Sequence, residues 1–135
     1  MLQNKKCCID SSVWVKYAGH FKIATLFNCI NTNSLVVFAD NYLLSEIHEA
    51  LVTGFDFSFS EADKAIHLVE SISLITAPRN VYRFSPDPKD NYLYDICIQN
   101  NCMYLITNDK ELLMDKHAPF LRKTDAWLKK LNRGR

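Results

Sequence analysis

The sequence contains few of the residues that interrupt regular secondary structure. Only three glycines and four prolines occur among 135 residues, and no segment is repetitive or biased toward a few residue types. This composition argues against a flexible linker or a disordered half. No apolar run reaches the roughly 18 residues that a membrane span needs, and the N-terminus lacks the apolar stretch of a signal peptide. We therefore expect one globular domain over residues 1–135, in the cytoplasm and with no membrane contact.

Several kinds of site are also excluded by what is missing. The five cysteines are odd in number, two of them are adjacent, and no C-x-x-C motif occurs, so neither a disulfide framework nor a zinc knuckle is indicated. Gly19, Gly54 and Gly134 stand too far apart to form a phosphate-binding loop, which excludes a nucleotide-binding module of that type. The four histidines show no metal-ligand spacing. The acidic residues remain as the main source of chemistry.

Strand-like and helix-like segments alternate along the chain. Short runs of apolar and β-branched residues predict strands at 7–9, 35–39, 73–76, 103–107 and 120–122. Apolar residues spaced three and four apart predict helices that start near residue 13 and then cover 20–31, 41–52, 60–71, 90–98, 110–114 and 124–131. We expect Gly54 to end the third helix and Ser60 to begin the fourth. Such alternation is typical of an α/β fold, here a three-layer αβα sandwich with a mainly parallel central sheet.

Four acidic residues stand where secondary structure is expected to change or on the helices that follow. Asp10 and Asp109 each follow a predicted strand, Asp90 opens a predicted helix, and Glu46 lies within one. In a parallel α/β sheet the ends of the strands meet at one rim, where ligands bind. Carboxylates gathered there repel one another unless a cation is present, and oxygen ligands suit Mg²⁺ or Mn²⁺. The sequence therefore predicts a metal-dependent enzyme that acts on phosphate groups.

Short polar residues stand next to these acids. They can hydrogen-bond to the carboxylates or contact a phosphate oxygen, and they are Ser11, Ser12, Thr107 and Asn108. Asp87 and Asp95 are weaker candidates for the same supporting role.

Each acid also has a plainer interpretation. Asp10 and Asp90 could only cap helices, and Asp109 could only form a turn. Glu46 differs because it borders the apolar side of its helix, where a carboxylate needs a partner that a metal ion would supply.

These residues carry a resemblance to a known family. Four blocks have the order Cys7–Val13, Leu44–Ile47, Asp87–Leu93 and Leu105–Leu113. Together they resemble PIN-domain nucleases, and within that group the toxin components of bacterial toxin–antitoxin pairs. The last two blocks are the more specific, and the similarity extends from Lys6 to Leu131.

The resemblance implies more than the residues alone. The acidic site of the family maps onto Asp10, Glu46, Asp90 and Asp109. The family implies an αβα sandwich, dependence on Mg²⁺ or Mn²⁺, endonucleolytic cleavage of RNA with 5′-phosphate products, frequent homodimers, and inhibition by a small antitoxin protein. Two positions depart from the usual pattern: Ser12 stands where many members have Asn, and Asn108 where close relatives often have Gly.

Other readings of the same pattern remain open. A PIN-like domain could bind RNA or a partner protein without catalysis, and another Mg²⁺-dependent phosphate-handling α/β domain could share the acidic rim. A phosphatase of the haloacid-dehalogenase type needs a second Asp two residues after the first, where this chain has Ser12. A response-regulator receiver would have paired acids after its first strand, whereas this chain has one.

Charge and aromatic residues suggest partners. Residues 1–109 carry eight Lys and Arg against twelve Asp and Glu, whereas residues 110–135 carry eight against three. A basic tail beside an acidic site suits a polyanionic substrate, and the candidate RNA contacts are Lys123, Lys129, Lys130 and Arg133. Aromatic residues on the early helices exceed the need of a small core, and they include Tyr17, Phe21 and Phe27. They suggest a homodimer, with the antitoxin bound in an adjoining groove; the alternative is that these rings all belong to the core.

Overall fold

The computed structural model describes residues 5–83, 85–115 and 120–133, and side chains as far as residue 130. The side chain of Arg133, an expected RNA contact, and His117 therefore lie outside the described part of the chain.

The centre of the molecule is a five-stranded sheet with the order β3-β2-β1-β4-β5. All four pairs of neighbouring strands are parallel, so the expected α/β fold is confirmed and the sheet is wholly parallel. The strands are β1 (Lys6–Ile9), β2 (Val36–Asp40), β3 (Ser73–Thr76), β4 (Tyr104–Ile106) and β5 (Leu121–Lys123).

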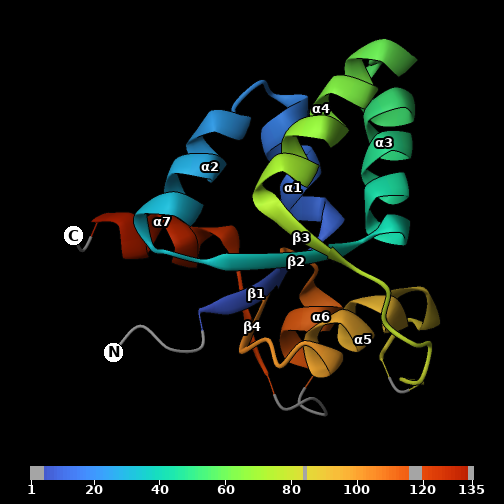
Figure 1. Cartoon of the computed structure of the whole chain (residues 1–135), viewed down its shortest axis with the longest axis vertical. Helices are drawn as coiled ribbons and strands as arrows, with labels where there is room; N and C mark the ends of the chain where they lie inside the picture. Colours follow the sequence, from blue (N-terminus) through green and yellow to red (C-terminus); the bar gives the residue numbers. More distant parts are fainter. Residues whose placement is uncertain (1–4, 84, 116–119, 134–135) are drawn as a thin grey trace.

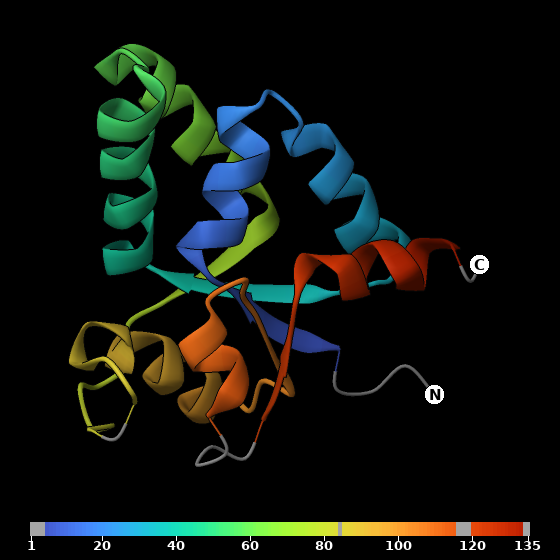
Figure 2. The same ribbon diagram turned by 180° about the vertical axis from the view of Figure 1, so that it is seen from behind.

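Helices cover both faces of this sheet (Figures 1 and 2). Helices α1 to α4 lie on one side, α5 and α6 lie on the other, and α7 packs against α2. Their bounds are α1 (Ser11–Gly19), α2 (Ile23–Thr32), α3 (Asn41–Phe55), α4 (Phe59–Ile72), α5 (Asn91–Gln99), α6 (Lys110–Met114) and α7 (Asp125–Arg133). A short 3₁₀ helix, η1 (Pro88–Asp90), leads into α5.

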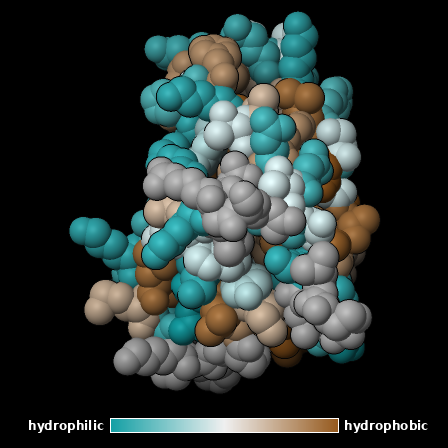
Figure 3. All heavy atoms as spheres, turned by 90° about the vertical axis from the view of Figure 1, so that its left-hand side faces the viewer, coloured by the Kyte–Doolittle hydropathy of each residue, from teal (hydrophilic) through white to brown (hydrophobic). Residues whose placement is uncertain are grey.

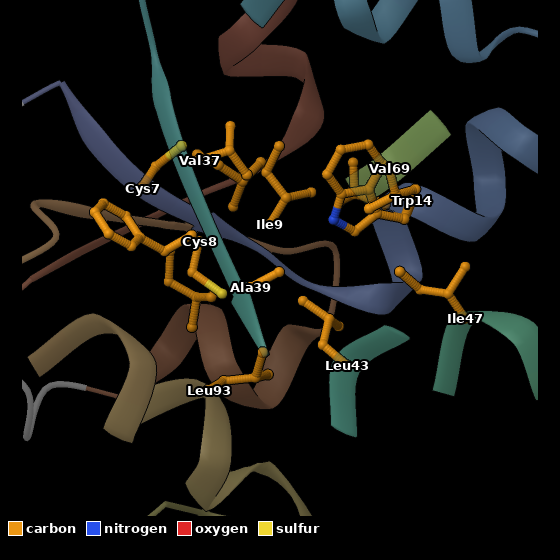
Figure 4. Packing of buried hydrophobic residues seen from close by; sticks show 14 of the residues in the cluster. Cys7, Cys8, Ile9, Trp14, Val37, Ala39, Leu43, Ile47, Val69 and Leu93 are labelled. Carbon is orange, nitrogen blue, oxygen red and sulfur yellow. The ribbon is translucent and has the colours of Figure 1, made fainter. Parts of the chain in front are cut away.

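Side chains alternate across β1, as a strand between two helical layers requires. Cys8 points toward α5 and Leu93, while Ile9 points to the opposite side with Trp14 (Figure 4). All of these side chains have no exposed surface, so the short apolar run that starts the chain is buried on both faces. The cysteines are free and buried, as the sequence indicates.

The helix expected over residues 20–31 begins three residues later, at Ile23. Phe21 has a φ of 58°, in the left-handed region, which ends α1 and turns the chain before α2. The exposed fraction of Phe21 is 81%, whereas Tyr17 is only 5% exposed and belongs to the core. Of the aromatic residues expected at a partner surface, only Phe21 is therefore openly exposed.

Helix α3 continues past Gly54, where the sequence predicted its end. Phe55 belongs to the helix, and its ring packs so closely on α1 that a Cβ at Gly19 would lie 2.4 Å from a ring carbon. Asp56 ends the helix in the left-handed conformation, with a φ of 57°, which Asp tolerates better than most residues. The packing of Phe55 explains why the weak helix former Gly54 stays helical.

Helix α4 begins at Phe59 and not at Ser60. Ser58 and Glu61 form a capping box, in which the Glu61 amide donates to the Ser58 hydroxyl and the Ser58 amide donates to the Glu61 carboxylate. Ser58 and Ser60 stand close together in the sequence, and either could cap the helix. Ser58 is the cap because Glu61 lies three residues after it, which is the spacing of a capping box.

Figure 3 shows the face of the molecule that lies to the left in Figure 1, on the side of α2 and α7. Hydrophilic and hydrophobic residues are interspersed over the part of this face that is not grey. None of the helices in the described part of the chain is both long and apolar enough to cross a membrane.

Candidate functional site

The acidic residues gather where the direction of strand order reverses. Strand β1 lies between β2, which follows it in the chain, and β4, which comes much later. Asp10 directly follows β1, and Asp109 is three residues beyond the end of β4. Parallel sheets place ligands at such a switch point, beyond the carboxyl ends of the strands.

Three hydroxyl groups hold the Asp10 carboxylate. Thr107 Oγ1 donates to Oδ2 over 2.8 Å, Ser12 Oγ donates to Oδ2 over 3.0 Å, and Ser11 Oγ lies 3.4 Å from Oδ1. Asp10 stands at the N-cap position of α1, but its carboxylate makes no capping bond to the helix. Burial raises the pKa of Asp10, and the bonds from Thr107 and Ser12 oppose this rise.

Thr107 connects Asp10 to Asp109. Its hydroxyl donates to Asp10 and accepts the Asp109 amide at 3.0 Å. Asp109 in turn caps α6 by accepting the Glu111 amide at 2.8 Å, so its expected turn role is present together with its place at the rim. Asn108 lies in the same turn, where its side-chain oxygen accepts the Asp125 amide at 3.3 Å.

Asp90 shows how close the carboxylates are to one another. It stands at the start of α5 without a side-chain capping bond. Burial, followed by the negative charges of Asp10, Asp109, Asp87 and Glu46, raises its pKa from 3.8 to about 7. Asp10, Asp109 and Glu46 therefore all lie within electrostatic reach of Asp90, although they come from distant parts of the chain.

Glu46 has a protein partner that sequence reasoning missed. The Tyr92 hydroxyl donates a short hydrogen bond to Glu46 Oε1. This bond links α3 to α5 and supplies the partner that had been assigned to a metal ion alone. Burial and the bond to Glu46 raise the pKa of Tyr92 far above its ordinary value, so Tyr92 stays protonated and keeps donating.

The two weaker acidic candidates, Asp87 and Asp95, lie in different places and have different hydrogen-bond partners. Asp87 accepts the Lys89 amide at 3.1 Å and caps η1, and its charge acts on Asp90. Asp95 is 2% exposed, and its Oδ1 accepts the backbone amides of Val81 and Tyr82 at 3.2 and 2.9 Å. Asp95 thus anchors the loop before η1 and does not support the four rim acids directly.

The carboxylates at the rim are of the kind that binds a hard cation, although they do not form a compact cluster of metal ligands. In the residues that the structure describes, no three acidic, histidine or cysteine side chains already form a metal-binding group. The four rim acids nevertheless offer only carboxylate oxygens, and the pKa of Asp90 is raised by burial and then by the negative charges of the other acids. A divalent cation relieves such repulsion, and carboxylates with free water positions fit Mg²⁺ or Mn²⁺.

The basic residues near the C-terminus lie on and before α7. Lys123 at the end of β5 lies 5.8 Å from the Trp127 ring centre, and the side chains of Lys129 and Lys130 are exposed. Helix α7 is fixed to α1 by Asp125, whose carboxylate accepts hydrogen bonds from Lys16 at 2.7 Å and from the Tyr17 hydroxyl at 3.1 Å.

Comparison with known proteins agrees with the fold. A family model described as PIN domain matches residues 6–111, and the chain belongs to that family. Domains of this family are typically Mg²⁺-dependent nucleases. The fold is similar to the crystal structure of PAE2754 from Pyrobaculum aerophilum, with a TM-score of 0.62, 15% identity, and coverage of 98% of this chain and 99% of that one. A search of curated proteins finds no match.

We expect that replacing Asp90 by Asn stabilises the protein when no divalent cation is present. The pKa of Asp90 is about 7 in the folded protein and 3.8 ordinarily. As the pH rises between these values, the unfolded chain loses the proton first and stability falls. Asn carries no charge and removes this loss, about 1–2 kcal/mol at pH 8 once screening by solvent is allowed for. Urea unfolding in EDTA measures the difference.

The pH dependence distinguishes this cause from a general change in packing. At pH 3 or below, the wild-type carboxyl is mostly protonated in both states, because this pH lies below both the ordinary pKa of 3.8 and the raised pKa of the folded protein. The stability difference between the two proteins should therefore nearly vanish there. Glu70→Gln, which neutralises an exposed carboxylate on α4, is the matched control and should change little at either pH. Equal stability of wild type and Asp90→Asn at pH 8 would rule out strong crowding at the rim.

Proposed function

We propose that this PIN domain is a metal-dependent endoribonuclease and the toxin of a toxin–antitoxin pair. The observation that supports the nuclease most strongly is the link between Asp10 and Asp109 through the Thr107 hydroxyl at the switch point of the sheet. The raised pKa of Asp90, caused by burial and then by the charges of nearby acids that include Asp10, Asp109 and Glu46, supports the same site. The toxin role rests on the resemblance of the four sequence blocks to toxin components.

The residues of the chain divide the work of such a site. Asp10, Glu46, Asp90 and Asp109 would hold Mg²⁺ or Mn²⁺. When bound, the ion supplies activation of a water molecule and neutralisation of charge on the phosphate. Thr107 and Ser12 fix the Asp10 carboxylate by hydrogen bonds, and Tyr92 fixes Glu46. Such bonds hold the oxygens in place before the substrate arrives.

The products of cleavage test the proposal. Purified protein incubated with end-labelled single-stranded RNA and Mg²⁺ should cut internally and leave 5′-phosphate and 3′-hydroxyl ends. These ends are expected when water attacks the phosphorus and the bond from phosphorus to the 3′-oxygen breaks, so that this oxygen leaves as the hydroxyl. Ends with 2′,3′-cyclic phosphate would instead mean attack by the 2′-hydroxyl of the RNA and would contradict the mechanism. Growth arrest on expression of the wild type, relieved by a small co-expressed protein, would support the toxin role.

The basic residues of α7 are expected to recruit RNA. Lys129→Ala combined with Lys130→Ala should weaken binding to all sequences, and each lost phosphate contact should flatten the log–log salt dependence by roughly 0.7. Cleavage at saturating RNA should change little, since uniform binding does not affect the chemical step. Filter binding between 50 and 200 mM salt measures the slope, and an unchanged slope would leave α7 as an ordinary solvated helix.

We also expect the protein to form a homodimer. Phe21 is 81% exposed, and its ring stacks on Phe57 at 5.5 Å beside a groove formed with α4. Exposed aromatic surface of this kind is enriched in protein interfaces. Light scattering at tens of micromolar should give twice the mass of 15.6 kDa. A monomeric mass under these conditions would count against the dimer.

A further inference from the structure

A second cavity lies beside the acidic rim. Its volume is about 630 Å³, within the range of small-molecule and nucleotide sites. The ends of β2 and β3 border it with the loop before η1 and the start of α5. The lining residues used below are Asp40, Tyr42, Arg83, Lys89, Tyr92 and Asp95.

The cavity adjoins the carboxylate site through α5. Tyr92 lines the cavity and donates to Glu46 at the rim. Lys89 and Asn91 also line it and stand on either side of Asp90 in the chain. Strand β2 leads to the cavity and is the direct neighbour of β1. Neighbouring strands in a sheet lie about 4.8 Å apart. A phosphate at the rim would therefore have its neighbouring nucleotide at the cavity.

Tyr42 gives the cavity an aromatic wall. Its exposed fraction is 53%, and the centre of its ring lies 4.6 Å from that of Tyr92. Tyr92 is buried and bonded, so it supports one side of the Tyr42 ring and leaves the exposed part for a ligand. Nucleobases stack on such rings in proteins that bind single strands.

Two carboxylates supply hydrogen-bond acceptors. Asp40 caps α3 by accepting the Leu43 amide at 2.8 Å and is only partly buried. Asp95 is 2% exposed, and its Oδ2 has no hydrogen-bond partner among the residues that the structure describes. A buried acceptor without a partner is costly, and in the wall of a cavity it favours a ligand that brings N–H groups.

We infer that the cavity binds the base of an unpaired guanosine next to the phosphate that is cut. This inference rests on the proposed ribonuclease function. Guanine carries two adjacent donors, N1–H and the N2 amino group, on one edge. Adenine, cytosine and uracil each present one donor beside acceptor atoms, which a carboxylate repels. Arg83 and Lys89 lie at the same cavity and suit the phosphates on either side of that nucleotide.

Mapping of cut sites in a random-sequence RNA tests this preference. With wild-type protein and Mg²⁺, guanine should be enriched at one fixed position next to the cut. Asp40→Asn should remove the enrichment, because Asn still caps α3 but presents an amide donor to guanine. Glu49→Gln, a matched change at an exposed carboxylate of α3, should retain the enrichment. Cutting without any base preference beside the cut would overturn the inference.

Binding of mononucleotides separates this inference from the nuclease itself. In EDTA, guanosine 5′-monophosphate should bind at least about tenfold more tightly than the adenosine or inosine forms, the scale of one hydrogen bond to a charged group. Tyr42→Ala changes an exposed side chain and should weaken binding of every base. Selective binding of guanosine 5′-monophosphate without RNA cleavage would support the guanine pocket and contradict the nuclease function. RNA cleavage with equal affinities for all nucleotides would support the nuclease function and contradict the guanine pocket.

Discussion

Replacing Asp10 by Asn is expected to lower the rate of RNA cleavage at least about a hundredfold, more than the loss of a supporting residue. Asn has the size of Asp, and its side-chain oxygen can still accept from Thr107 and Ser12, so the fold should remain intact. The negative charge needed for a divalent cation is lost, however. Single-turnover cleavage at saturating RNA measures the rate, and thermal melting confirms folding.

Two further variants make this result specific. Thr107→Val removes the hydroxyl that joins Asp10 to Asp109 and should lower the rate by about 10–100-fold while all four carboxylates remain. Glu70→Gln neutralises an exposed carboxylate on α4 and should cleave like the wild type. Cleavage by Asp10→Asn at the wild-type rate would remove Asp10 from the site.

Removing divalent cations should abolish cleavage. EDTA should stop the reaction, and excess Mg²⁺ or Mn²⁺ should restore it, because carboxylates alone neither activate water nor neutralise phosphate charge. Ca²⁺ is larger and less strictly octahedral, so it should bind with little turnover. The measurement is the initial rate of cleavage in each metal after dialysis against chelator.

The pH dependence of this requirement follows from Asp90. Its pKa is about 7 without metal, so protons compete with the cation below that pH and more Mg²⁺ should be needed for half-maximal cleavage. In Asp90→Asn the competition at this position disappears together with much of the affinity for the cation. Full activity of the wild type in excess chelator would contradict any role for a divalent cation.

The fold was largely predictable because strands and helices here follow local patterns. Buried runs such as Cys7–Ile9 and the β-branched segment before Asp40 lie in the predicted strands. The same reasoning placed Asp10 and Asp109 at one rim, because neighbouring parallel strands end together. The errors occurred where long-range packing decided the outcome, as when Phe55 kept α3 helical beyond Gly54.

The details of the site depend on contacts that local patterns do not contain. The bond between Glu46 and Tyr92 joins residues that are 46 positions apart, and nothing near Glu46 in the sequence indicates it. Asp40, which lines the cavity beside the rim, was also missed. It is the last residue of β2 and so ends its strand near the same rim as Asp10, and this parallel could have revealed it. Phe21 left the predicted helix because a left-handed residue was needed between α1 and α2.

A crystal of the protein soaked in Mn²⁺ would test most directly whether the four carboxylates share a cation. The proposed site predicts an anomalous peak between Asp10, Glu46, Asp90 and Asp109, with oxygen atoms at about 2.1 Å. The peak should be absent from crystals of Asp10→Asn soaked in the same way. A wild-type rim without Mn²⁺, or Mn²⁺ bound only elsewhere on the protein, would contradict the metal-dependent nuclease.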